Sequence, residues 1–235
     1  MSLVPVGSYE DHGLMPPETD ILIARCVTQR AEAAALKEGL HVVVLPPVPY
    51  STSPEHSHRR RTVSVSTLSY ASYVSEILSS AASRWGAGIL AVFHGGAYYP
   101  SYTVVRELRA RGMLVALYNF WGSAAKVVEE VAGCSGIHHA DEVEASILAA
   151  CGYNTGIVEA SLQEVVGHVR SRCKRLKPRY EPWMGGDFEE LGQLYPRSPV
   201  PASAELGLTI VKEASKNLVD IVRALSRGYQ NSASL

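Results

Sequence analysis

The chain has 235 residues, and 46% of them are hydrophobic, which is enough for a full core and excludes a disordered protein. Its 22 Lys and Arg residues nearly balance 23 Asp and Glu residues. This balance excludes a general nucleic-acid or membrane-surface binder, so any anion site must be local. We expect a single domain over residues 1–235 that binds a small molecule, and no apolar stretch approaches the roughly 18 residues of a membrane span.

Short apolar runs alternate with longer amphipathic segments. Strands are predicted at 3–6, 41–48, 88–93 and 113–120, and helices at 21–38, 67–85, 101–111, 142–151 and 202–225. This alternation predicts an α/β fold, a three-layer sandwich with a mostly parallel sheet covered by helices on both faces. Residues 174–201 form the only long irregular stretch. Parallel sheets bind ligands beyond the C-terminal ends of their strands, where the polar clusters of this chain also lie.

The four cysteines are widely spaced and form no C-x-x-C pattern. They are Cys26, Cys134, Cys151 and Cys173. This spacing predicts reduced thiols rather than a disulfide framework or a zinc–thiolate site. No charged start followed by an apolar run is present, so no signal peptide is expected. We therefore expect a cytoplasmic protein.

A Gly- and Pro-rich loop after the first strand gathers residues of the kinds that bind metals. Glu10 and His12 are two residues apart, so in an extended backbone they face the same way. Asp20 opens the next helix, where a carboxylate is equally typical of an N-cap. The loop therefore predicts half of a metal site and needs partners from elsewhere in the chain.

Two further strand ends supply such partners. His94 directly follows the strand at 88–93 and precedes two glycines. This position is typical either of a ligand on a rigid strand end or of an incidental residue in a turn. The segment HHADEVEAS, residues 138–146, places Glu142 and Glu144 beside two histidines at a helix start. Acidic residues in a first turn often only complement the helix dipole, but that reading does not account for the paired histidines.

The loop after the second strand contains three adjacent arginines. Arg59, Arg60 and Arg61 are unusual in a nearly neutral protein. Such a charged run usually indicates a solvated loop. The functional interpretation is a binding site for phosphate or carboxylate, because guanidinium groups bind these anions in bidentate fashion.

Taken together, these clusters resemble the creatininase family, that is creatinine amidohydrolase and its relatives. The first family motif, roughly G-S-x-E-x-H-G-x-H-L-P-x-x-T-D, corresponds here to GSYEDHGLMPPETD. The second, S-x-E-H-x-x-F-P-G-T-x-S, corresponds to SPEHSHRRRTVS. The third, N-G-H-G-G-N or H-Y-E-N, corresponds to VFHGGAYY, and the fourth, H-A-G-E-x-E-T-S, to HADEVEAS. DFEELGQLYPRSPVPASAELG resembles the family's tail, so the likeness covers nearly the whole chain.

The resemblance implies a metal-dependent hydrolase that acts on C–N bonds other than peptide bonds, with two divalent ions per subunit. The implied metal ligands are Glu10, His12, Asp20 and His94, with Asp20 bridging both ions. In the H-Y-E-N branch a further carboxylate ligand stands where this chain has Gly96, so Glu144, or less readily Glu142, is expected to replace it as ligand and catalytic group. His139 matches the family's active-site histidine.

The resemblance also suggests substrate contacts and an assembly. The substrate-binding candidates are Ser53, His56, Arg59, Arg60, Arg61 and Trp121. The family often forms homohexamers, so a homo-oligomer is expected. Oxygen and imidazole ligands suit Zn²⁺, Mn²⁺ or Fe²⁺. A bound metal lowers the pKa of its water to roughly 7, and His139 or a carboxylate would move the proton to the leaving nitrogen.

Three departures from the family pattern bear on the substrate and the second metal. The first motif is one residue shorter, with Met15 in place of its second histidine; Ala97 replaces the asparagine after the glycines; and the arginines replace F-P-G. A triple arginine favours an anionic, nucleotide-like formamide, similar to the substrates of archaeal deformylases of the family, over creatinine. A peptide substrate is a third possibility, and a non-catalytic binding relative that has lost a metal is the alternative class.

Overall fold

The computed structural model describes residues 1–175 and 195–232. Its central sheet has four parallel strands in the order β2-β1-β3-β4: β2 is Val43–Val44, β1 is Ser2–Val6, β3 is Gly88–Val92 and β4 is Val115–Asn119. Every β1 and β3 residue is buried, as expected for strands covered on both faces. A second sheet pairs β5 (Ile157–Glu159) with β6 (Val200–Ala202).

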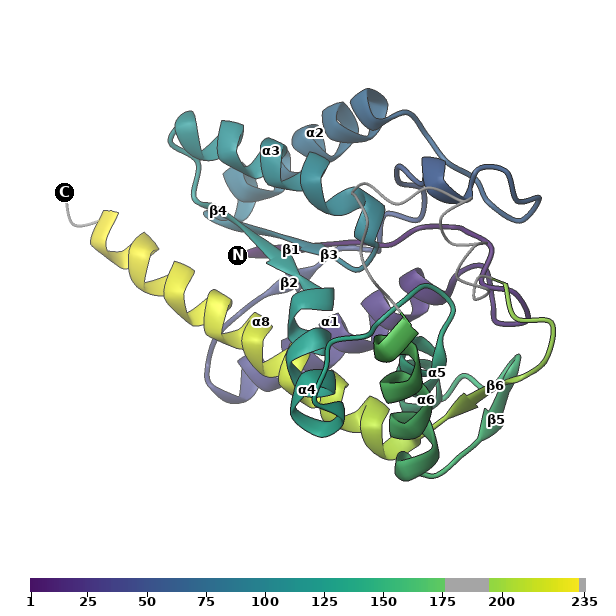
Figure 1. Ribbon diagram of the computed structural model, residues 1–235. Helices are drawn as coiled ribbons and strands as arrows, with labels where there is room; N and C mark the ends of the chain where they lie inside the picture. Colours follow the sequence, from purple (N-terminus) through teal and green to yellow (C-terminus); the bar gives the residue numbers. More distant parts are fainter. Residues whose placement is uncertain (176–194, 233–235) are drawn as a thin grey trace.

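Helices cover both faces of the central sheet (Figure 1). One face carries α2 (Thr67–Trp85) and α3 (Tyr98–Ala110). The core of the other face draws on α1 (Thr19–Lys37), α4 (Phe120–Ala132), α5 (Glu142–Ala150), α6 (Leu162–Arg175) and α8 (Ala204–Ser232). Two separate hydrophobic clusters flank the sheet, which confirms the predicted three-layer α/β fold. None of the described helices is long and apolar enough to cross a membrane.

The element predictions are correct at most positions and wrong in two ways. The strand expected at 41–48 is observed only at Val43–Val44, followed by one isolated bridge between Val48 and Val6. The pairing is interrupted because Pro46 and Pro47 have no N–H to donate. Helices α4 and α6 and strands β5 and β6 were not predicted. The irregular stretch expected at 174–201 lies mostly outside the described residues.

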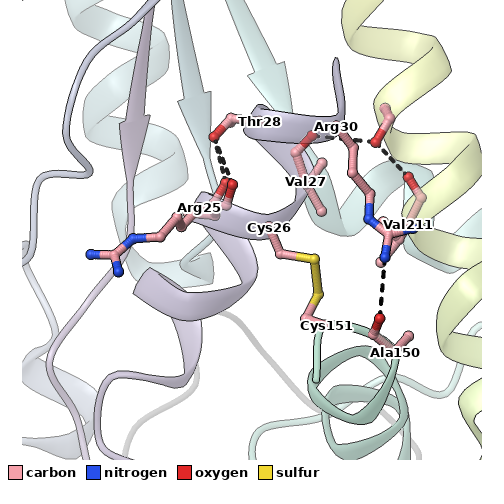
Figure 2. Close-up of a disulfide and its surroundings, with 10 residues drawn as sticks. Arg25, Cys26, Val27, Thr28, Arg30, Ala150, Cys151 and Val211 are labelled. Carbon is pink, nitrogen blue, oxygen red and sulfur yellow. Dashed lines mark hydrogen bonds between the residues drawn. A yellow bond between two sulfur atoms is a disulfide. The ribbon is translucent and has the colours of Figure 1, made fainter. Parts of the chain in front are cut away.

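The prediction of reduced thiols is wrong, because all four cysteines are paired. Cys26 on α1 bonds Cys151 just after α5, and Cys134 after α4 bonds Cys173 on α6. The sequence separations are 125 and 39 residues, so no short-range spacing pattern could reveal these pairs. Figure 2 shows the first bridge, with Arg30 of α1 donating nearby to the Ala150 carbonyl at 3.3 Å.

Removing the Cys26–Cys151 bridge should destabilise the fold without touching the candidate site. A disulfide that closes so long a loop contributes roughly 2–4 kcal/mol. The Cys26→Ser/Cys151→Ser variant should therefore melt roughly 5–15 °C lower than the wild type, measured by calorimetry. Thiol titration of denatured protein purified without reductant is the control. Four free thiols there would contradict the pairing.

Candidate active site

The register of the sheet brings the predicted site residues together. Val6 at the end of β1 pairs with Val92 of β3, which pairs with Asn119 of β4. The loop that carries Glu10 leaves β1 at this edge, and His94 follows β3 by two residues. Asn119 caps α4 by accepting a hydrogen bond from the Trp121 N–H at 3.1 Å, which places Trp121 at the same edge.

One cluster of ligand atoms combines Glu10, Asp20 and His94. His94 Nδ1 lies 3.1 Å from Glu10 Oε1 and 3.2 Å from Asp20 Oδ2. All three residues are buried, and their ligand atoms lie within 4.8 Å of one another, a span that could hold one metal ion.

A second group of ligand atoms surrounds His12. Its Nε2 lies 3.7 Å from Asp20 Oδ1 and 3.5 Å from Glu144 Oε2. Asp20 therefore presents one oxygen to each group. It is not the N-cap of α1, since the helix begins at Thr19 with Glu18 in the cap position. If each group held a metal ion, the Asp20 carboxylate could contact both ions.

Hydrogen bonds on the outer side of the His12 and His94 rings indicate which nitrogen of each ring carries a proton. His12 Nδ1 lies 2.9 Å from the Glu10 carbonyl oxygen, and His94 Nε2 lies 3.1 Å from the Thr52 carbonyl oxygen. A carbonyl oxygen only accepts, so these nitrogens carry the protons. On a neutral ring, the opposite nitrogen then points its lone pair at carboxylate oxygens, which are also hydrogen-bond acceptors. Such a group of acceptors is stabilised by a cation.

Buried polar atoms without hydrogen bonds also indicate a metal site. His12 Nε2 and Asp20 Oδ2 are buried and have no hydrogen-bond partner among the described residues. Leaving such atoms unsatisfied costs about 1–3 kcal/mol each. A divalent metal with oxygen and nitrogen ligands satisfies both atoms, so the residues present fit the metals that the sequence predicts.

The pKa values show an excess of buried negative charge. Burial, followed by repulsion from Glu10, raises the pKa of Asp20 to about 7. Burial and then the Asp20 charge raise the pKa of Glu144 well above its usual range. Burial alone would also raise the pKa of Glu10, but neighbouring His94 lowers it well below its usual value. Burial would lower the pKa of His94, but the Glu10 charge and the other neighbouring carboxylates raise it well above its usual value. In a protein without metal, a proton on His94 therefore offsets part of the negative charge.

The structure explains why position 96 carries no carboxylate. A Cβ on Gly96 would overlap Glu55 Oε1 and lie 2.6 Å from His94 Nε2, so even alanine does not fit. Glu55 occupies that space, with Oε1 3.3 Å from His94 Nε2. It contacts the outer nitrogen of the ring, whereas Glu10 and Asp20 face the inner nitrogen, Nδ1. Glu144 of α5 lies beside His12 instead.

A cavity of about 550 Å³ opens onto these groups. Its polar side includes Glu10, Asp20, His94 and Glu144. Its other walls are apolar or aromatic and are lined by Tyr99, Trp121, Ala125 and Ile137. The volume suits a small organic molecule.

Other predicted site residues take different places around the cavity. His56, His139 and Trp121 line it, and the His56 and His139 rings stack at 3.9 Å between centroids. Ser53 is buried behind the cavity, where its hydroxyl donates to Glu10 Oε2 at 2.5 Å. Ser53 thus orients a carboxylate instead of lining the cavity.

None of the three arginines lines the cavity. Arg59 Nε lies 3.3 Å from Asp11 Oδ2, and Arg61 donates to the carbonyls of Gly13 and Met15 at 2.7 Å each. These two residues therefore brace the loop that carries Glu10 and His12. Arg60 is exposed and forms no ion pair within the described part of the chain.

Two residues near the site had no predicted role. Glu55 matched the second motif, but nothing in the sequence showed that it would fill the space beside Gly96. Tyr195 has its hydroxyl 2.9 Å from His56 Nδ1, and its ring lies 3.8 Å below the Arg59 guanidinium. It is separated from His56 by 139 residues, so no local pattern could indicate the contact.

Comparison with known proteins assigns the chain to a family. The model of the creatininase family, described as creatinine amidohydrolase, matches residues 1–222. The chain belongs to the creatininase family. Members of this family are metal-dependent amidohydrolases that act on C–N bonds other than peptide bonds, and the chain is an enzyme of that class.

Solved creatininase structures share the fold. A mutant creatininase of Zn-Zn type is 20% identical, with a TM-score of 0.67 over 95% of this chain and 90% of that one. A creatinine amidohydrolase (creatininase) is 21% identical, with a TM-score of 0.66 over 97% and 90%. A putative creatinine amidohydrolase from Bacteroides fragilis NCTC 9343 is 20% identical, with a TM-score of 0.62 over 95% and 88%. None of the curated proteins matches the chain in sequence.

Proposed function

We propose that this creatininase-family enzyme hydrolyses an amide or formamide C–N bond of a small molecule at a two-metal centre. Glu10, Asp20 and His94 would hold one ion, and His12, Asp20 and Glu144 the other. The observation that carries the proposal is the pair of buried carboxylate and imidazole clusters that share Asp20. Zn²⁺ and Mn²⁺ suit the ligands and are named for solved relatives, and Fe²⁺ is also compatible.

Bound metals would polarise the amide carbonyl and supply hydroxide near neutral pH. The chain's own contribution to proton transfer centres on His139. Its Nε2 donates to the Asp11 carbonyl oxygen at 2.6 Å, so Nδ1 faces Glu10 Oε1, 3.5 Å away, with a lone pair. Burial lowers the pKa of His139, which keeps the ring neutral. Nδ1 can therefore accept a proton and pass it to a leaving nitrogen.

The cavity walls limit what can bind. Trp121 is held by its indole N–H, which donates to the Phe93 carbonyl oxygen at 2.8 Å, so its ring forms a fixed wall. Among the described lining residues there is no Lys or Arg, so a compact uncharged amide fits the inner cavity. Creatinine is such a molecule, and it remains the second candidate.

An anionic, nucleotide-like formamide is the substrate we favour, with its charged end outside the cavity. Arg60 supports this choice, because it is exposed in the turn that follows two cavity residues, Glu55 and His56. A phosphate contact far from the reacting amide binds the ground state and the transition state alike. Arg60→Ala should therefore raise KM for a phosphorylated formamide about tenfold, with kcat unchanged, since a charged hydrogen bond contributes roughly 1.5 kcal/mol or more.

Steady-state kinetics on formamide nucleotides, creatinine and short peptides, each with Zn²⁺, Mn²⁺ or Fe²⁺, tests the proposal. The same formamide without its phosphate is the matched control, and its hydrolysis should be unaffected by Arg60→Ala. Normal KM for the phosphorylated substrate in that variant would reduce Arg60 to surface charge and leave creatinine as the better candidate. Metal binding with no hydrolysis of any of these compounds would favour a non-catalytic relative.

A further inference from the structure

The segment between α4 and α5 carries the proposed proton-transfer group. Residues 133–141 connect the two helices and contribute Ser135, Ile137, His138 and His139 to the cavity wall. Within this segment Ala140 has φ 55° and is the one non-glycine residue with positive φ in the described chain. This left-handed conformation is unfavourable for an L-residue, so contacts from outside the segment must hold it.

Arg172 of α6 provides those contacts. Its side chain is only 4% exposed, although it carries a full charge. Nε donates to the Gly136 carbonyl oxygen at 3.3 Å, Nη1 donates to Glu142 Oε2 at 2.5 Å, and Nη2 lies 3.2 Å from Asp141 Oδ2. One guanidinium group thus contacts both the middle and the end of the segment.

Asp141 links this guanidinium to the candidate site. Its Oδ1 caps α5 by accepting from the Val143 and Glu144 amides at 2.8 and 3.0 Å. Its Oδ2, which faces Arg172, accepts from the His138 amide at 2.8 Å. The Asp141 carboxylate therefore fixes the backbone conformation before and after Ala140 through these hydrogen bonds.

The strained residue is in turn bonded to a proposed metal ligand. The Ala140 amide donates to Glu144 Oε2 at 2.6 Å, the oxygen that also faces His12 Nε2. On the other side of Ala140, His139 reaches the Asp11 carbonyl oxygen. A change in the path of residues 138–141 would therefore shift both His139 and Glu144.

A disulfide anchors the opposite end of the segment to the same helix. Cys173, next to Arg172, bonds Cys134. Gly136 packs so closely here that a Cβ would lie 2.5 Å from Cys173 Sγ. The start of the segment is thus fixed covalently, and its end depends on Arg172.

We propose that Arg172 is a positioning residue, which acts through Asp141 to hold His139 and Glu144 in place. The inference rests on the proposed roles of these two residues. Without the guanidinium group, Asp141 and Glu142 would be two neighbouring, largely buried carboxylates with no counter-charge from Arg172, and the αL turn at Ala140 would relax.

Arg172→Gln tests this role, with Arg170→Gln as the matched control. Arg170 also lies on α6, but it donates to the Ala132 and Val131 carbonyls at the end of α4. Displacing groups from a reacting geometry by about 1 Å can cost on the order of 100-fold in rate. We expect Arg172→Gln to lower kcat by about that factor with little change in KM, and Arg170→Gln to match the wild type. Arg172→Lys keeps the charge but loses the planar guanidinium group that contacts several acceptors at once, so its kcat should lie between those of Arg172→Gln and the wild type.

Amide hydrogen exchange on metal-free protein separates this inference from the proposed function, because it needs neither substrate nor turnover. In Arg172→Gln the amides of His138 and Ala140 should exchange faster, while those of β1 and β3 stay protected. Faster exchange throughout the chain would mean a general loss of stability and would overturn the positioning role. Unchanged exchange at both amides would also overturn it. If Arg172→Gln does not fold, the same comparison is made on Arg172→Lys.

Discussion

Replacing Asp20 with alanine should remove both metal ions and reduce hydrolysis by on the order of 1000-fold or more, since both ions contribute transition-state charge stabilisation. The reason is that its two oxygens face different histidines, Oδ1 toward His12 at 3.7 Å and Oδ2 toward His94 at 3.2 Å. Elemental analysis of purified protein gives the metal content per chain. Glu18→Ala is the matched control, since Glu18 is also acidic and lies two residues away, outside the cavity.

The loss of metal in this variant should not come from unfolding. The pKa of Asp20 is raised from 3.8 to about 7 in the metal-free fold, because its ionised form is buried beside Glu10. An acid whose pKa is raised by folding destabilises the fold once it ionises. That cost is absent below pH 3.8, grows as the pH rises toward 7 and is complete above it. Metal-free Asp20→Ala should therefore be no less stable than metal-free wild type at pH 8. Unchanged metal content in the variant would contradict the bridging role.

Replacing Glu144 with glutamine should remove one metal and most of the turnover. The carboxylate lies 3.5 Å from His12 Nε2 and is absent from the group around His94. Glutamine keeps the volume and can still accept from the Ala140 amide, so the neighbouring backbone should hold. We expect one metal per chain and a kcat lower by on the order of 100-fold or more, because the remaining ion would act without the second ion's contribution to carbonyl polarisation and water activation.

Glu142→Gln is the comparison within the same helix turn. Glu142 points away from the cavity, to Arg172 and to His168 Nδ1 at 3.2 Å. It should keep both metals. Two metals in Glu144→Gln together with one in Glu142→Gln would reverse the assignment of these carboxylates.

The fold and much of the site could be predicted because their signals are local. Apolar strands separated by amphipathic helices indicate the parallel sheet, and α2 begins and ends at the predicted residues. Glu10, His12 and His94 follow strand ends, where a parallel sheet necessarily gathers them. Motif order then connected these residues to Asp20 and Glu144.

The remaining features depend on contacts that no local pattern encodes. Charge composition could not show that Arg59 and Arg61 bind the Asp11 loop instead of a ligand. A glycine at position 96 did not reveal that Glu55 fills the adjacent space. The disulfides and Arg172 join segments that are at least 30 residues apart, so only the fold brings them together.

Anomalous X-ray diffraction from crystals grown with Zn²⁺ or Mn²⁺ tests the central claim most directly. Two anomalous peaks should flank the Asp20 carboxylate, one beside Glu10 and His94 and the other beside His12 and Glu144. A single peak, or two peaks that do not share Asp20, would contradict the two-metal centre.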